Sequence, residues 1–78
     1  MGDLRVMLPP FGEENGGKAK VSFWYMDVGQ RVAEGDNLVQ MLTDKATFDV
    51  PSPAAGVLKH QAAGEGDEVQ VGQLLCIL

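Results

Sequence analysis

An internal repeat constrains the fold of this 78-residue chain more than any other feature of its sequence. The pattern G-x-x-V-x-x-G-x-x-L begins at Gly29 and recurs from Gly66, an offset of 37 residues. The match extends backwards, where Ala19 aligns with Gly56. Half of so short a chain cannot bury an apolar face alone. We therefore expect the two halves to pack on each other with approximate two-fold symmetry.

Short apolar runs separated by turn residues indicate an all-β fold, either a small barrel or a sandwich. Ten glycines and four prolines interrupt these runs, and no long stretch has helical periodicity. One domain is expected to span residues 1–78. Strands are expected near residues 4–8, 19–26, 31–33, 37–43, 46–50, 55–61, 68–70 and 73–77.

Charge and composition exclude several classes of function. The net charge is −5 and the basic residues are scattered, which argues against a nucleic-acid partner. The longest apolar run is far too short to span a bilayer, so no membrane association is expected. His60 is the only histidine and Cys76 the only cysteine. A metal site, an internal disulfide and a nucleophilic triad are therefore not expected.

A β-hairpin is predicted in the segment LTDKATFDV, residues 42–50, with Asp44 and Lys45 as its two turn residues. One pairing register places the apolar side chains of both strands on the same face of the hairpin. It predicts the cross-strand pairs Met41–Phe48, Val39–Val50 and Gln40–Asp49. The turn chemistry is unusual, because a lysine stands where such hairpins favour glycine. The hairpin joins the two repeats, so it should lie at one end of the molecule and the chain termini at the other.

The sequence TDKATFDVPSPAAGVL, Thr43 to Leu58, resembles the lipoyl domain of the acyltransferase components of 2-oxo acid dehydrogenase complexes. The similarity covers nearly the whole chain, including LPPFGEENGG, Trp24 and the final GDEVQVGQLLCIL. The resemblance implies a flattened barrel or sandwich of two four-stranded antiparallel sheets related by a pseudo-two-fold axis. It also implies that Lys45 carries lipoic acid covalently, a group that a recombinant apo-domain can lack. A functional lysine accounts for the broken turn rule.

The same resemblance assigns recognition roles to neighbouring residues. Asp44 and Ala46 would help a lipoate ligase or lipoyl transferase to distinguish Lys45 from other lysines. The polar, glycine-rich loop 12–18 reads from its residues alone as a plain connection between strands. The resemblance instead makes it a contact for the decarboxylase, with Glu13 and Glu14 as its charges.

The implied function is that of a carrier, not of an enzyme. A thiamine-dependent 2-oxo acid decarboxylase reductively acylates the lipoyl-lysine swinging arm, which delivers the acyl group to the acyltransferase core. Dihydrolipoamide dehydrogenase then reoxidises the arm. We expect a monomeric domain, excised from the N-terminus of a larger acyltransferase. We expect it in the cytoplasm of a bacterium or archaeon rather than in a mitochondrial matrix.

Two alternatives share this architecture. A biotin carrier domain also modifies a hairpin lysine, but that family usually flanks it with methionines rather than with Asp44 and Ala46. An unmodified interaction module would need no lysine at the tip and usually carries long helical insertions, which this chain lacks. The lipoyl carrier protein of glycine cleavage is a further lipoyl carrier, but it is a longer chain than this one.

Overall fold

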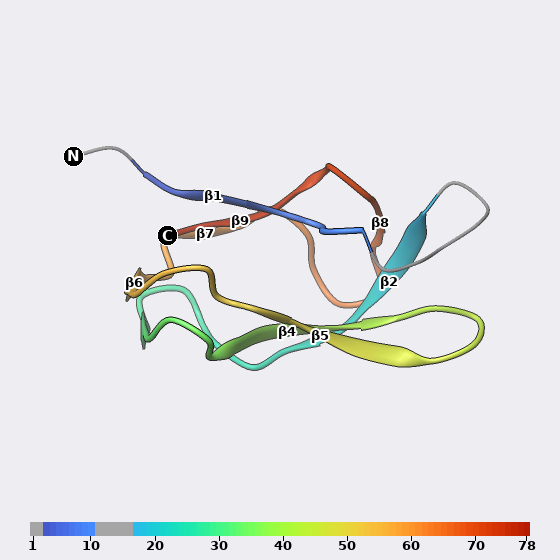
Figure 1. Ribbon diagram of the computed structural model, residues 1–78, viewed down its shortest axis with the longest axis horizontal. Coiled ribbons are helices and arrows are strands. Elements are labelled where there is room, and N and C mark those ends of the chain that lie inside the picture. The colour runs from blue at the N-terminus through green and yellow to red at the C-terminus, as the bar shows by residue number, and fades with distance from the viewer. Residues whose placement is uncertain (1–2, 11–16) are drawn as a thin grey trace.

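The structure, a computed structural model, describes residues 3–10 and 17–78, and its regular elements there are all β-strands (Figure 1). The molecule is elongated, with principal extents of 36 × 20 × 19 Å. Its strands are β1 (Arg5–Met7), β2 (Lys18–Trp24), β3 (Arg31–Val32), β4 (Asn37–Leu42), β5 (Thr47–Pro51), β6 (Gly56–Val57), β7 (His60–Gln61), β8 (Glu68–Gln70) and β9 (Leu74–Ile77). None of the described segments forms a helix that could cross a membrane.

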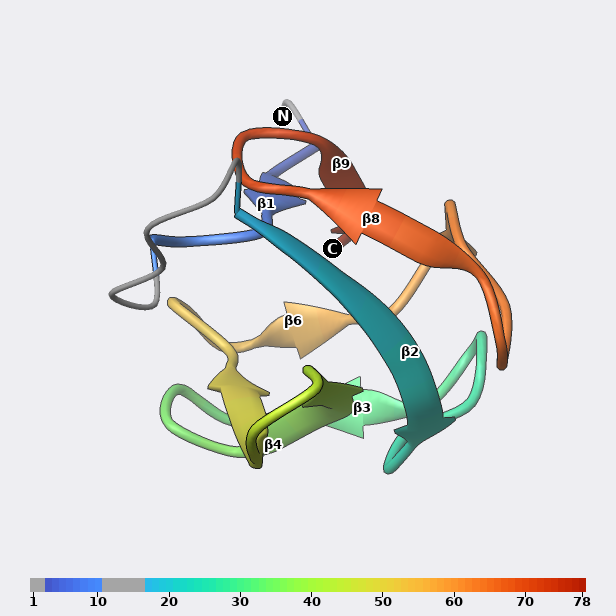
Figure 2. The same cartoon turned by 90° about the vertical axis from the view of Figure 1, so that its right-hand side faces the viewer.

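Two antiparallel layers face each other across the core, which confirms the predicted sandwich; it is flattened and not a closed barrel. The first layer is a four-stranded sheet in the order β5-β4-β2-β8. Figure 2 shows β2 running diagonally from β8 towards β4. The second layer is a three-stranded sheet, β1-β9-β7, and β3 and β6 form a separate two-stranded pair.

The expected strand 55–61 is divided into β6 and β7, so the second layer is not one continuous four-stranded sheet. Leu58 donates its backbone N–H to Gln30 O, whereas Lys59 donates to Ile77 O. The chain therefore changes its hydrogen-bonding partner between these two residues. At the equivalent place in the first half, β2 has a bulge between Val21 and Phe23. One irregularity thus recurs in both halves and breaks the strand only in the second.

The glycine repeat is confirmed as a pair of equivalent corners. Gly35 has φ +90° and Gly72 has φ +87°, backbone angles that strain any residue with a Cβ. A side-chain oxygen of Asp36 accepts the backbone N–H of Ala33. At the same offset of 37 residues, Gln73 accepts the N–H of Gln70. The corners therefore match in backbone conformation and in the hydrogen bonds that hold them.

The two halves differ in length at one place. Leu8 exchanges backbone hydrogen bonds with the corner at Gly72 and Gln73, as Ser52 does with the corner at residues 35–36. Leu8 and Ser52 are therefore equivalent. Ala19 and its counterpart Gly56 follow them by 11 and 4 residues, respectively. The first half thus has seven additional residues in the connection that includes loop 12–18.

A single apolar core fills the space between the layers. Its best buried side chains come from both repeats: Leu38 and Leu75, equivalent in the repeat, are both fully buried. Trp24 packs against this core and donates its indole N–H to Ala63 O at 2.9 Å. The core residues are Val6, Leu8, Ala19, Val21, Val32, Leu38, Val39, Met41, Val50, Leu58, Ala63, Val69, Leu75, Cys76 and Leu78.

Candidate modification site at the hairpin tip

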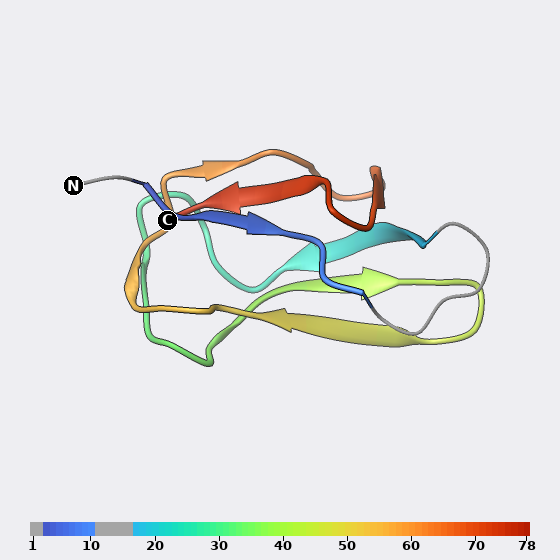
Figure 3. The same ribbon diagram turned by 45° about the horizontal axis from the view of Figure 1, so that its top comes forward.

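The hairpin formed by β4 and β5 projects from one end of the molecule, and the C-terminus lies at the other (Figures 1 and 3). There Leu4 and Leu78 exchange backbone hydrogen bonds. The predicted register is confirmed in full: Met41 pairs with Phe48, Val39 with Val50 and Gln40 with Asp49. Met41, Val39 and Val50 are buried, and Phe48 packs against the core. The buried face therefore anchors the hairpin to the core, while its outer face and its tip are in solvent.

The turn itself is held by the side chain of Thr43. Its Oγ1 accepts the backbone N–H of Lys45 at 3.3 Å and that of Ala46 at 3.1 Å. The same hydroxyl donates to Ala46 O at 3.0 Å, an oxygen that also accepts the backbone N–H of Thr43 at 2.8 Å. Four hydrogen bonds thus close a turn of which Asp44 and Lys45 are the central residues.

This arrangement explains how a lysine can occupy the tip. Among the described residues every positive φ belongs to a glycine, so neither Asp44 nor Lys45 has one. The two-residue turns that favour Asn-Gly require positive φ at one or both central residues, and this turn is therefore of another kind. The hydroxyl of Thr43 bonds the turn amides, and Lys45 avoids left-handed strain. Sequence reasoning missed Thr43, although threonine is a known former of side-chain-bonded turns.

The three residues Asp44, Lys45 and Ala46 are all exposed, as the predicted modification site requires. Glu13 and Glu14, also predicted to take part in recognition, lie outside the described residues. Leu42, which closes the strand pairing opposite Thr47, is 42% exposed. The tip therefore presents a lysine between one acidic and one small side chain, beside an exposed leucine.

A polar network stiffens the outer face behind the tip. Tyr25 donates its hydroxyl to Asp49 at 2.8 Å, and Asn37 donates to the other oxygen of the same carboxylate at 3.3 Å. This hydrogen bond to Asp49 is the main cause of a raised pKa for Tyr25. Phe23 packs edge-on against Tyr25, with ring centroids 4.7 Å apart. The network links β2, β4 and β5, the strands on which the tip depends.

Other candidate groups do not assemble into a site. The described part of the chain contains no group of three His, Cys, Asp or Glu side chains that could hold a metal ion. Cys76 is fully buried, and this burial raises the pKa of its thiol to about 11.

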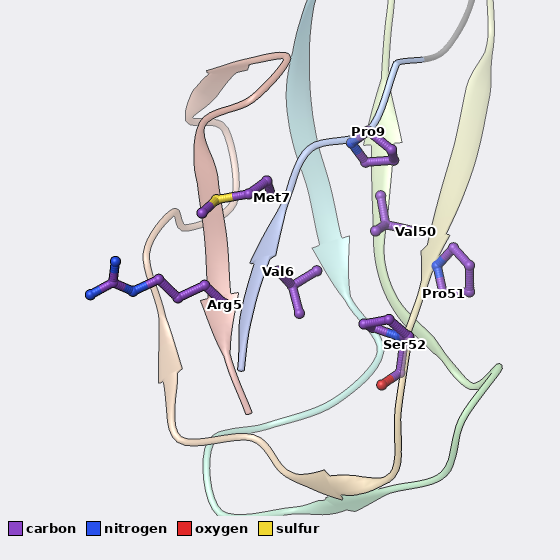
Figure 4. Close-up of a pocket in the computed structure, with 8 residues that line it drawn as sticks. Arg5, Val6, Met7, Pro9, Val50, Pro51 and Ser52 are labelled. Carbon is purple, nitrogen blue, oxygen red and sulfur yellow. The ribbon is translucent and has the colours of Figure 1, made fainter. Parts of the chain in front are cut away.

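A shallow groove of about 370 Å³ lies between the edge strands β1 and β5, away from the tip (Figure 4). Val6 and Met7 of β1 line one side of it, and their repeat counterparts Val50 and Pro51 line the other. Pro9, Pro51 and Pro53 line it and have no N–H to offer, which discourages the addition of a further strand.

The comparison with known families agrees with this geometry. A family model for biotin and lipoyl attachment, described as "Biotin-requiring enzyme", matches residues 5–78. The chain belongs to the biotin/lipoyl attachment family. In a member of this family, an exposed lysine at a hairpin that joins two repeats is the natural candidate for the attachment residue.

Relatives place this biotin/lipoyl domain near the lipoyl members. The dihydrolipoyllysine-residue succinyltransferase component of the 2-oxoglutarate dehydrogenase complex of Bartonella vinsonii subsp. berkhoffii is 43% identical over 70 residues, 90% of this chain. The dihydrolipoyllysine-residue acetyltransferase component of the pyruvate dehydrogenase complex of Cupriavidus necator is 36% identical over 77 residues, 99% of this chain. The chain spans only 17% and 14% of the length of these two proteins.

A solved structure matches over nearly the full length of both chains. The lipoyl domain of the 2-oxoglutarate dehydrogenase complex from Azotobacter vinelandii, determined in solution, has a TM-score of 0.74 and 29% identity. The match covers 95% of this chain and 94% of that domain. The fold is therefore that of a lipoyl domain.

Proposed function

We propose that this chain is a lipoyl carrier domain and that Lys45 takes lipoic acid in amide linkage. The observation that carries the proposal is the position of Lys45, which is exposed at the hairpin tip, at the opposite end of the molecule from the C-terminus. Membership of the biotin/lipoyl family and similarity to a solved lipoyl domain support it.

The residues at the tip fit covalent attachment. Acylation needs an exposed primary amine, and in the described part of the chain Lys45 forms no ion pair, whereas Lys59 is paired with Asp3. The unprotonated Nζ of Lys45 attacks the carbonyl carbon of an activated lipoyl donor. An amide bond forms, the activating group leaves with its electron pair, and the nitrogen loses a proton. The amide product has no charge at Lys45. The loss of this positive charge makes the formal net charge, which is −5 before attachment, more negative by one unit.

The domain contributes presentation rather than catalysis. When bound, the lipoyl group supplies a cyclic disulfide that can be reductively acylated and later reoxidised by thiol–disulfide exchange. The chain's own residues hold the attachment point away from the body of the domain and keep the only thiol, Cys76, out of solvent. Acyl transfer would belong to the remainder of a larger acyltransferase.

The proposal also names partners. A thiamine-dependent 2-oxo acid decarboxylase, an acyltransferase core and dihydrolipoamide dehydrogenase would meet the arm in turn, after a lipoate ligase or lipoyl transferase has attached it. The fold and the relatives support these partners, because the relatives belong to 2-oxoglutarate and pyruvate dehydrogenase complexes.

Intact-mass spectrometry tests the proposal directly. The domain is produced in a host supplied with lipoate and, separately, with a biotin ligase and biotin, and peptide mapping locates any adduct. We expect one lipoyl group, on Lys45, and none on the Lys45→Arg variant, which should fold normally. An adduct on Lys18, Lys20 or Lys59 of that variant would contradict the assignment. Modification by biotin alone would favour the biotin carrier alternative.

A further inference from the structure

The hydroxyl of Thr43 has no hydrogen-bonding capacity left for any partner protein. A threonine hydroxyl has one donor and two acceptor sites. Thr43 uses all three inside the turn, with the N–H groups of Lys45 and Ala46 as donors and Ala46 O as acceptor. Any effect of this hydroxyl on the modification of Lys45 must therefore be exerted through the conformation of the turn.

The hydroxyl stands in for a backbone group. In most tight turns the amide of the fourth residue bonds the carbonyl oxygen of the first. Here the amide of Ala46 bonds the side chain of Thr43, and the amide of Lys45 shares the same oxygen. Without the hydroxyl, both amides would turn to water, and the tip could exchange among several turn conformations.

The conformation of the turn determines the direction in which the Lys45 side chain leaves the backbone. The Lys45 side chain is long and flexible, so its own rotamers do not fix the direction of Nζ. What can be fixed is the direction in which its Cα–Cβ bond leaves the hairpin. Residues on either side are exposed and in contact with solvent, which leaves the turn hydrogen bonds as the main local constraint.

We infer that Thr43 is a positioning residue for the modification of Lys45, through the bonds that its hydroxyl makes to the turn amides. The inference rests on the proposed function and deepens it by naming what makes the lysine a substrate. A modifying enzyme binds the one turn conformation that Thr43 stabilises. When only a fraction of the domain has that conformation, apparent affinity falls by the same fraction.

The effect should appear in KM rather than in kcat. Domain already bound to the enzyme has the competent turn, so the chemical step is unchanged. Free domain must reorganise the turn before it binds. We expect Thr43→Val, which keeps the branched shape and loses the hydroxyl, to raise KM about tenfold, the factor that 1.4 kcal/mol represents. We expect kcat to stay within about twofold.

Two further variants make the test specific. Thr43→Ser keeps the hydroxyl and loses only the methyl group, so it should restore a KM close to that of the wild type. Thr47→Val is the matched control, because Thr47 is an exposed threonine of the same hairpin. In the described structure no hydrogen bond involves the hydroxyl of Thr47. Steady-state lipoylation of the unmodified domain by a lipoate ligase, followed by intact mass, gives KM and kcat for all four proteins.

A second measurement does not depend on the enzyme. Amide temperature coefficients and ¹⁵N relaxation by NMR report whether the amides of Lys45 and Ala46 are bonded and ordered. We expect both amides to lose protection and order in Thr43→Val and to keep them in Thr43→Ser and Thr47→Val. The pairing of β4 with β5 should be unchanged in all three variants.

The outcomes separate the inference from the proposed function. An unchanged KM for Thr43→Val, with the wild type lipoylated normally, would overturn the inference and leave the proposed function intact. An equal loss in Thr43→Ser would also overturn it, because the methyl group would then be responsible. Amides that remain ordered in Thr43→Val would refute the structural step. A wild-type domain that no ligase lipoylates would instead overturn the proposed function, and the positioning role with it.

Discussion

Val39 and Cys76 occupy equivalent places in the two layers. Val39 lies opposite Val50 in the first layer, and Cys76, 37 residues later, lies opposite Val6 in the second. Both side chains are fully buried. The only thiol of the chain thus occupies a site that its symmetry mate fills with an aliphatic group, and it serves as a small apolar side chain.

We therefore expect Cys76 to be inert in the folded domain. Burial raises the pKa of its thiol from 9.0 to about 11, so almost no thiolate is present near neutral pH. A soluble thiol reagent should not label the native apo-domain but should label it stoichiometrically in denaturant. Rapid native labelling would show that the thiol is accessible. In a lipoylated and reduced domain, native labelling should report only the lipoyl thiols.

The same pKa shift predicts a pH dependence of stability. The folded thiol keeps its proton above pH 9, where the unfolded thiol begins to lose it. The free energy of unfolding should therefore fall as pH rises from about 9 to about 11. Cys76→Val, which copies the side chain of Val39, removes the ionisable group and should make this decline less steep in urea titrations. An identical decline in the variant would contradict the assignment to Cys76.

The corner glycines predict a pair of equal destabilisations. Gly35 and Gly72 both have positive φ, and a Cβ added to either would meet no atom within 4 Å. The cost of alanine at these positions is therefore conformational, about 1–2 kcal/mol each. Gly56→Ala is the control, since its φ is not positive and its Cβ would contact Leu78 Cβ at an ordinary 3.7 Å. Urea unfolding should show similar losses for the first two variants and little change for the third.

The residues that flank the lysine should determine which group it receives. The resemblance to lipoyl domains assigns this discrimination to the side chains beside Lys45, those of Asp44 and Ala46. We expect Asp44→Met combined with Ala46→Met to increase modification by a biotin ligase, measured as biotin incorporation by intact mass. If the double variant remains a substrate for lipoylation only, discrimination depends on another surface.

The seven additional residues of the first half lead to a prediction about docking. They belong to the connection that carries Glu13 and Glu14, and the second half has no counterpart. Exposed charges at the rim of an interface mainly alter association rate and salt dependence. Glu13→Gln with Glu14→Gln should leave lipoylation unchanged but slow reductive acylation by the cognate decarboxylase at low salt, with little effect on stability. Equal acylation rates for the wild type and the double variant at low salt would contradict a docking role. The loop would then be a plain connection between strands.

The hairpin register and the repeat could be predicted because both depend on local alternation and spacing. The alternation places Met41 and Phe48 on the same face of the hairpin, and the repeat spacing places Gly35 and Gly72 at equivalent corners. The break between Leu58 and Lys59 could not be predicted, because it arises where the chain changes partner between two strands distant in sequence. The role of Thr43 was missed because it depends on the backbone angles of the residues that follow it.

The repeats interlock, and this has a consequence for folding. In the first layer, β2 and β4 come from the first half of the chain and β5 and β8 from the second, while β1 from the first half pairs with β9 from the second. Neither half of the chain can complete a sheet without strands from the other half. Most strand pairings therefore close long loops, at an entropic cost. We expect the domain to fold in one cooperative step and slowly for its size, as topologies rich in non-local contacts do.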